Sequence, residues 1–264
     1  FKVTISASEG CYRVEADRPI DVVGGAVSGG GSTSVTATGV SRLVVETGGN
    51  AGEVFIEALD IPADVRVDSG YSRVVLGAWD SPDGLSAVKA PVVVTAGPNV
   101  WHASVELVDV GSTRPAEYTI TADAVAATGG FGGVTFSGLT YVGLDGSSTG
   151  PGGEPSRYNV LGVADGVTVD VISREAAGGR SEFVLDAAEP ATDAHVNLHN
   201  QRGEATFTIR KTASPTGLIV FGESARVIAS DDGSTAGLRH TVTVVSVVWT
   251  PVDLLVDDSA GDAA

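Results

Sequence analysis

The feature that most constrains this chain is a succession of short extended segments with almost no helical pattern between them. Long windows with apolar residues at helical spacing are interrupted by Gly or Pro. Alternating runs such as residues 43–46, 54–57 and 196–198 recur along the chain, separated by the turn-forming residues Gly, Asp, Asn, Ser and Pro. The sequence therefore predicts an all-β fold.

The spacing of these runs limits the number of possible architectures. Val54 follows Leu43 by 11 residues, and Phe207 follows Val196 by the same interval. A strand of about four residues plus a turn of about six fits both a β-sandwich and a β-solenoid. Sandwich hairpins need some longer strands, whereas a solenoid pairs each short strand with the layers above and below it. We therefore expect a right-handed parallel β-helix, or β-solenoid, with tandem β-sandwich domains as the alternative.

A longer internal repeat accompanies the strand spacing. Two kinds of segment each recur three times, at intervals of roughly a hundred residues. They occupy residues 34–48, 133–146 and 241–258 and, upstream of these, residues 12–17, 118–123 and 226–231. We interpret the chain as a single solenoid of about two and a half modules. The expected modules are 1–103, 104–211 and a partial third, 212–264.

Three phrases of this repeat carry a resemblance, namely Gly133–Leu144, Pro91–Thr95 and Tyr118–Thr121. In these phrases, and in the short strands that end in Gly-Asp turns, the chain resembles large repetitive secreted or surface proteins of bacteria, including planctomycetes. The resemblance covers most of the chain at the level of pattern. It implies a right-handed β-helix on a cell surface or in an extracellular matrix.

Proteins of that kind often carry Gly-Gly-x-Gly-x-Asp turns that bind calcium, and this chain departs from them. Residues 47–53 keep the glycines but contain no Asp, and residues 230–234 have their acids in another order. A calcium site needs several oxygen atoms that converge on one ion, and neither turn offers a full set. We therefore expect no metal and no cofactor, with structural calcium as the alternative.

Charge and cysteine content exclude several classes of function. The chain has 33 acidic and 16 basic residues, a formal net charge of −17, which repels nucleic acid. No apolar stretch is long enough for a membrane-spanning helix. The single Cys11 cannot form an intramolecular disulfide or a cysteine-based metal site. We expect a small buried residue there, with a reactive or intermolecular thiol as the alternative.

The histidines are weak candidates for a site. His195 and His199 flank a short strand and point to one face of it, but their Cα atoms would lie about 13 Å apart, too far for one metal ion. His102 and His240 have no partner in the sequence. A Ser–His–Asp site stays open, although no Gly-x-Ser-x-Gly elbow occurs. We interpret His195 and His199 as two surface or turn histidines.

Acidic pairs are the next candidates. They are Asp80/Asp83, Asp231/Asp232 and Asp257/Asp258. β-Helix lyases and glycosidases group carboxylates on one face. Here the acids lie in turns beside Gly and Ser, where Asp also forms turns. We interpret them as solvated turns, with weak calcium binding or catalysis as alternatives.

Aromatic residues and glycine-rich loops complete the candidates. A sugar-stacking strip would use Trp79, Trp101, Tyr71, Tyr141 and Tyr158. Aromatic faces suit pyranose rings, but such side chains also fill loops and cap the ends of rungs. Gly24–Gly31 and Gly146–Gly153 lack the Lys-Ser/Thr of a phosphate-binding loop and indicate long turns.

The sequence therefore predicts a non-enzymatic extracellular protein with a structural or adhesive role and no catalytic residues. Unpaired strand edges at the ends of a solenoid favour self-association into a filament, matrix or surface layer. The alternative is a carbohydrate-binding or carbohydrate-active β-helix protein whose partner is a polysaccharide or a cell surface.

Overall fold

The computed structural model describes residues 2–8, 11–16, 26–28, 33–47, 51–229, 235–246 and 250–256. In these ranges the chain is all-β, as predicted, with two short 3-10 helices, η1 (Gly84–Ala87) and η2 (Thr235–Gly237), and no α-helix. None of the helices described could cross a membrane. The strands are β1 (Lys2–Ser8), β2 (Cys11–Ala16), β3 (Ala26–Ser28), β4 (Ser34–Thr38), β5 (Leu43–Thr47), β6 (Ala51–Ile56), β7 (Ala63–Gly77), β8 (Val92–Val108), β9 (Glu117–Ile120), β10 (Ala124–Ala127), β11 (Val134–Ser137), β12 (Tyr141–Asp145), β13 (Ser156–Val160), β14 (Thr168–Ser173), β15 (Arg180–Asp186), β16 (His195–Asn200), β17 (Glu204–Lys211), β18 (Thr216–Val220), β19 (Ser224–Ala229), β20 (Val242–Ser246) and β21 (Val252–Val256).

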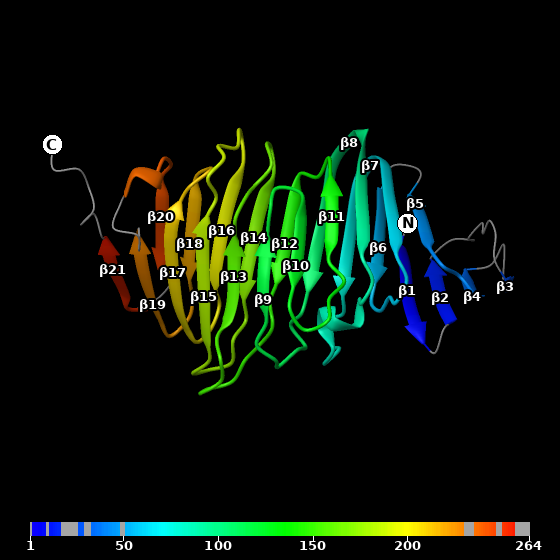
Figure 1. The fold of residues 1–264 in the computed structure, drawn as a ribbon, viewed down its shortest axis with the longest axis horizontal. Helices are drawn as coiled ribbons and strands as arrows, with labels where there is room; N and C mark the ends of the chain where they lie inside the picture. Colours follow the sequence, from blue (N-terminus) through cyan, green and yellow to red (C-terminus); the bar gives the residue numbers. More distant parts are fainter. Residues whose placement is uncertain are drawn as a thin grey trace.

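Strand pairing in the second half of the molecule follows one rule. Each strand from β12 onward pairs in parallel with the strand two positions further along the chain. The order β12–β14–β16–β18–β20 forms one row, and β13–β15–β17–β19–β21 forms the other. Two successive strands, one in each row, make a layer that we call a rung. Figure 1 shows the rungs stacked along the long axis, from β3 and β4 at one end to β21 at the other.

Two long strands connect the rows. The first halves of β7 and β8 pair with β5 and β11, and their second halves pair with β6 and β12. Two register shifts between β7 and β8 mark the bend, where bulges in β8 turn both strands from one row to the other. The sequence predicts separate strands at 65–68 and 74–76. The structure joins them in β7, because a bulged bend needs no intervening turn.

Antiparallel pairing is confined to two places in the described part of the chain. At the N-terminal end, β1 pairs with β2, and β4 pairs with both β2 and β3, all antiparallel. β1 then pairs in parallel with β6 and so continues the stack. Further along, β10 lies antiparallel between β9 and β11. All 21 strands belong to one hydrogen-bonded, mostly parallel sheet.

The 11-residue spacing in the sequence corresponds to half a rung. Val196 and Phe207 lie in β16 and β17, which belong to different rows. The register partner of Val196 in its own row is Thr216 in β18. The sequence interval thus measures the step from one row to the other. The division into modules ending at residues 103 and 211 stays a prediction.

The core lies between the two rows. In β14 and β16 alternate residues are buried, and buried residues of both rows belong to one hydrophobic cluster. One inward column holds the rings of Tyr118, Tyr158, Phe183 and Phe207, with centroid separations of 5.1, 4.8 and 4.7 Å. These residues are register partners in successive strands, so their spacing follows the strand spacing of about 4.8 Å. We call this column the aromatic ladder.

Both inward columns end at exposed side chains. In the row that contains the aromatic ladder, the column continues from Phe207 through Val227 to Leu254. In the other row, the column that contains Leu198 continues through Leu218 to Val244. Leu218 and Val227 are buried, whereas Leu254 is 66% exposed and Val244 is 38% exposed. Among the described strands, none pairs with the outer edge of β20 or β21. We call this apolar surface the C-terminal edge.

Candidate functional site

Polar side chains gather on the outward side of the row formed by the second halves of β7 and β8 with β12, β14, β16 and β18, which we call the outer face. Successive residues of a strand point to opposite sides, so each buried core residue alternates with one on this face. One outward column contains the register partners Glu106, Gly143, Asp170, Asn197 and Gly217. Residues from five rungs are therefore aligned on one surface.

Asp170 is the centre of a hydrogen-bonded chain on this face. Tyr141 donates its hydroxyl to Asp170 Oδ2 at 3.0 Å, and Asn197 Nδ2 donates to Asp170 Oδ1 at 2.7 Å. Tyr141 can lean across because a Cβ at Gly143 would lie 2.9 Å from its ring. Burial, together with the nearby Asp170 carboxylate, raises the pKa of Tyr141, so its hydroxyl keeps its proton. The chain ties three successive rungs together.

Arg73 contacts two carboxylates on the same face. Its guanidinium donates two hydrogen bonds to Glu106, at 2.7 and 2.5 Å, and lies 3.5 Å from Glu53 Oε1. The hydrogen bond to Glu106 is the main cause that raises the pKa of Arg73. This paired arrangement favours cohesion between rungs over catalysis, because the carboxylates are already engaged.

A second arginine organises the opposite border of the outer face. Arg174 Nε donates to Asp145 Oδ1 at 2.7 Å and Nη1 donates to Gln201 Oε1 at 2.9 Å. Its guanidinium also lies 5.8 Å from the centre of the Trp79 ring, a cation–π distance. The predicted candidate Trp79 thus packs against an arginine.

The histidines of β16 lie on this face, as the alternation predicts. His195 is exposed and His199 is half-buried. Burial lowers the pKa of His199, although Asp170 and Asp145 act in the opposite direction. Within the described ranges, no group of three His, Cys, Asp or Glu residues is arranged to hold a metal ion.

Three rings form an exposed aromatic cluster where β7 and β8 bend. Tyr71 stacks on His102, with centroids 4.8 Å apart and an interplanar angle of 13°. Trp101 lies at an angle to both, 5.8 Å from Tyr71 and 6.3 Å from His102. The indole of Trp101 is 71% exposed. The structure therefore brings Tyr71 and Trp101 of the possible sugar-stacking strip together and adds His102, for which the sequence showed no partner.

Tyr158 does not belong to the possible sugar-stacking strip, and it does not fill a loop or cap a rung either. Its side chain is fully buried in the aromatic ladder, between Tyr118 and Phe183. The reason is that successive side chains of a strand point to opposite sides. Tyr158 points away from the side of Arg157 and shares its side of β13 with the buried Val160. Tyr141 and Trp79 remain at the surface but lie apart from the cluster in other hydrogen-bonding and cation–π arrangements.

Two buried acids lie beside the ladder, and the sequence analysis missed both. Asp109 accepts hydrogen bonds from the Tyr118 hydroxyl at 2.6 Å and from the Leu85 backbone N–H at 2.9 Å. Glu175 accepts from the backbone N–H and the hydroxyl of Thr149. Burial raises the pKa of both carboxyl groups. No sequence signal separates them from solvated acids, because each follows a strand as a turn residue does.

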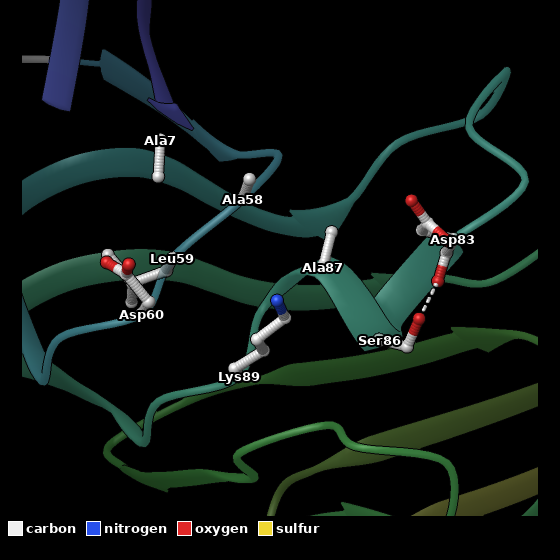
Figure 2. Close-up of a pocket in the computed structure, with 8 residues that line it drawn as sticks. All are labelled: Ala7, Ala58, Leu59, Asp60, Asp83, Ser86, Ala87 and Lys89. Atoms are coloured by element: carbon white, nitrogen blue, oxygen red, sulfur yellow. Dashed lines mark hydrogen bonds between the residues drawn. The ribbon is translucent and has the colours of Figure 1, made fainter. Parts of the chain in front are cut away.

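A surface hollow of about 340 Å³ lies beside η1. Figure 2 shows the Lys89 ammonium pointing into it, with Asp60 on one side and Asp83 on the other. Three alanines line much of the remaining wall, and their short side chains leave the space open. The hydroxyl of Ser86 donates to the backbone carbonyl of Asp83 at 2.6 Å and so takes part in the turn. The hollow shows no nucleophile with an aligned base.

The remaining candidates are dispersed. Asp80 is exposed in a turn, His240 donates its backbone N–H to the Thr212 hydroxyl at 2.9 Å, and Cys11 is a half-buried free thiol. In Gly146–Gly153, Gly146 is buried and the last four residues are exposed. Several candidates lie outside the described residues, namely Asp231, Asp232, Asp257, Asp258, most of Gly24–Gly31, part of the degenerate calcium turn at 47–53 and all of the one at 230–234.

Comparison of the chain with protein-family models, with curated proteins and with solved structures finds no match. Function is therefore inferred from the pairing of the strands and from the surfaces described above.

Proposed function

We propose that this chain is a non-enzymatic structural protein, a right-handed β-solenoid that serves as a stiff extracellular scaffold or adhesive module. The parallel pairing of every second strand supports a solenoid, since the sheets of β-sandwiches are antiparallel. The right-handed sense follows the strong preference of parallel crossover connections. The extracellular setting rests on the resemblance to repetitive bacterial surface proteins.

The way in which the polar groups are used supports a structural role. Glu106 is held by Arg73, Asp145 by Arg174, and Asp170 by Tyr141 and Asn197. Each of these contacts links different rungs. Together with the aromatic ladder inside, they resist sliding of one rung over the next.

The exposed C-terminal edge is the observation that supports self-association. Leu254 and Val244 continue columns that are buried in the preceding rungs, yet both are exposed. An uncovered strand edge with an apolar surface is a template for pairing with another chain. We propose that a second copy of this chain packs there, which would extend the stack into a filament, matrix or surface layer.

Light scattering after gel filtration, over a range of protein concentrations, tests this assembly, with negative-stain electron microscopy of the same samples. The wild type should form larger assemblies as concentration rises. The double variant Val244→Lys, Leu254→Lys should stay monomeric, because two charges cannot be buried unpaired. Val93→Lys is the control, since Val93 is 40% exposed on β8, away from the edge.

Monomeric wild type at every concentration would contradict the assembly, as would equal loss of association in the Val93 control. Limited proteolysis tests the solenoid separately. Tandem sandwich domains should be cut at a linker near residues 104–116, whereas a continuous solenoid should resist cleavage there, since β8 reaches Val108.

A further inference from the structure

The aromatic cluster exists because of a bulge in β8. Gly70 pairs with Val100 and Tyr71 pairs with His102, so Trp101 has no opposing residue in β7. An extra residue of this kind redirects its side chain, and bulges are frequent beside functional sites. Trp101 is 71% exposed, although tryptophan is usually a largely buried residue. The backbone irregularity thus presents an indole to solvent without using it in the core.

The arrangement of the rings leaves a flat surface for a ligand. His102 covers one side of Tyr71, with the two planes inclined by 13°. Trp101 is tilted by 51° to Tyr71 and by 46° to His102, so its ring is not stacked on either of them. The apolar C–H face of a pyranose ring packs on such an aromatic surface, while the polar edge of the aromatic residue stays available for hydrogen bonds.

A fixed polar group lies within the same cluster. The hydroxyl oxygen of Thr140 lies 3.1 Å from the carbonyl oxygen of Ala103 and accepts the N–H of Ala103 at 3.2 Å. Thr140 Oγ1 is also 3.1 Å from His102 Nδ1, so this ring nitrogen is hydrogen-bonded within the protein. Nε2 of His102 is then the ring nitrogen left for a ligand hydroxyl, which can both donate and accept.

The charges define the class of ligand. Arg73, two residues from Tyr71 on β7, is held by Glu106 and Glu53 and is not free for an anion. The chain as a whole has a net charge of −17, which disfavours acidic polymers. An exposed aromatic face beside an imidazole ring, with the neighbouring guanidinium already paired, fits an uncharged ligand rich in hydroxyl groups. We propose that the cluster of Tyr71, Trp101 and His102 binds a neutral, pyranose-based polysaccharide, with the Trp101 ring as the stacking surface.

Affinity gel electrophoresis tests this site on the intact chain. The native gels would contain hydroxyethyl cellulose, xyloglucan, galactomannan or, as an acidic comparison, alginate. At least one neutral polymer should retard the wild type, and alginate should not. Trp101→Ala should weaken that binding by about tenfold or more, as removal of a central aromatic contact does. His102→Phe keeps a ring beside Tyr71 but removes the polar ring nitrogens, and should weaken binding by about threefold to tenfold.

Trp79→Ala is the matched control, because Trp79 is also an exposed tryptophan but packs against Arg174 outside the cluster. It should bind like the wild type. The proposal is overturned if no neutral polymer retards the wild type, if Trp79→Ala and Trp101→Ala are equally impaired, or if alginate or a proline-rich peptide is bound in place of the neutral polymers. Far-ultraviolet circular dichroism should be unchanged in all variants. The result is independent of self-association, which the Val244 and Leu254 variants test.

Discussion

Two inward columns, one in each row, run through the middle of the stack and end at the C-terminal edge, but their side chains are buried in the middle and exposed at the edge. Leu198 and Phe207 are fully buried, whereas Val244 and Leu254, further along these columns, are exposed. The residues at both places are apolar. Burial in this molecule is therefore set by having a neighbouring rung on each side. Stability accumulates from contacts between adjacent rungs, as in other repeat architectures.

The largest expected effect comes from the middle of the aromatic ladder. Phe183→Ala should lower the free energy of unfolding by about 3–5 kcal/mol, because it leaves a cavity between Tyr158 and Phe207. Leu254→Ala, at the exposed end of the same column, should cost less than about 1 kcal/mol. Urea denaturation of both variants measures the difference. Equal losses would show that the edge is covered in solution.

Two glycines of one loop allow a second comparison, between a packed position beside the aromatic ladder and an open position. A Cβ at Gly146 would lie 2.1 Å from the Tyr158 hydroxyl oxygen, and Tyr158 is fully buried. Gly146→Ala should therefore cost about 1–3 kcal/mol through overpacking. Gly150→Ala, in the same loop, meets no atom within 4 Å and should be nearly neutral. Thermal unfolding compares them, and equal melting temperatures would contradict the packing described.

Buried Glu175 makes the middle of the stack sensitive to pH. Because burial raises its folded pKa, its contribution to stability is fully present below the ordinary value of 4.5 and is lost as pH rises through the folded pKa. Glu175→Gln should flatten this decline and raise stability near neutral pH by about 1–3 kcal/mol. Unfolding free energies from pH 4 to 8 test the prediction.

Glu189→Gln is the control for Glu175→Gln, since Glu189 is exposed and the change in net charge is the same. It should keep the wild-type pH dependence. If both variants flatten the curve equally, the effect comes from the net charge of −17 and not from the buried carboxyl group.

The smallest expected effect lies on the outside of the same central rungs. Arg157 Nε is 2.9 Å from Glu182 Oε2, with side chains 53% and 43% exposed. Arg157→Ala should change the free energy of unfolding by less than about 0.5 kcal/mol, because exposed ion pairs are weak. A loss as large as that of Gly146→Ala, measured by urea denaturation, would mean that surface pairs contribute substantially to the cohesion of the stack.

The local pattern was sufficient for the all-β class and for many of the strands. Alternation around residues 196–198 and 207–209 predicted extended segments, and the 11-residue interval predicted one strand plus one turn. Only the structure shows that this interval is the step between rows. The pairing partners could not be read in this way, because register depends on contacts between residues that are distant along the chain. The parallel order of β14, β16 and β18 appears only in three dimensions.

The candidate site was harder to predict, for identifiable reasons. The inward position of Tyr158 was readable, since it alternates with Arg157 and Asn159. The cluster around Trp101 was not, because Gly97 and Pro98 mark only the first register shift, and no residue type at 100–102 signals the bulge at Trp101 itself. Asp109 and Glu175 resemble solvated turn acids in sequence, and only the surrounding rungs make them buried.

The transverse orientation of the strands has a mechanical consequence. A load applied along the long axis would peel one rung at a time, because each rung is held only by its two neighbours. Val169 is the register partner of Val196, and Val196 is the register partner of Thr216. The release of one layer therefore frees the residues that lie between two such partners in the sequence. At about 3.3–3.6 Å per extended residue, one layer would lengthen the molecule by roughly 60–90 Å. Under tension the stack would therefore lengthen in steps, one layer at a time.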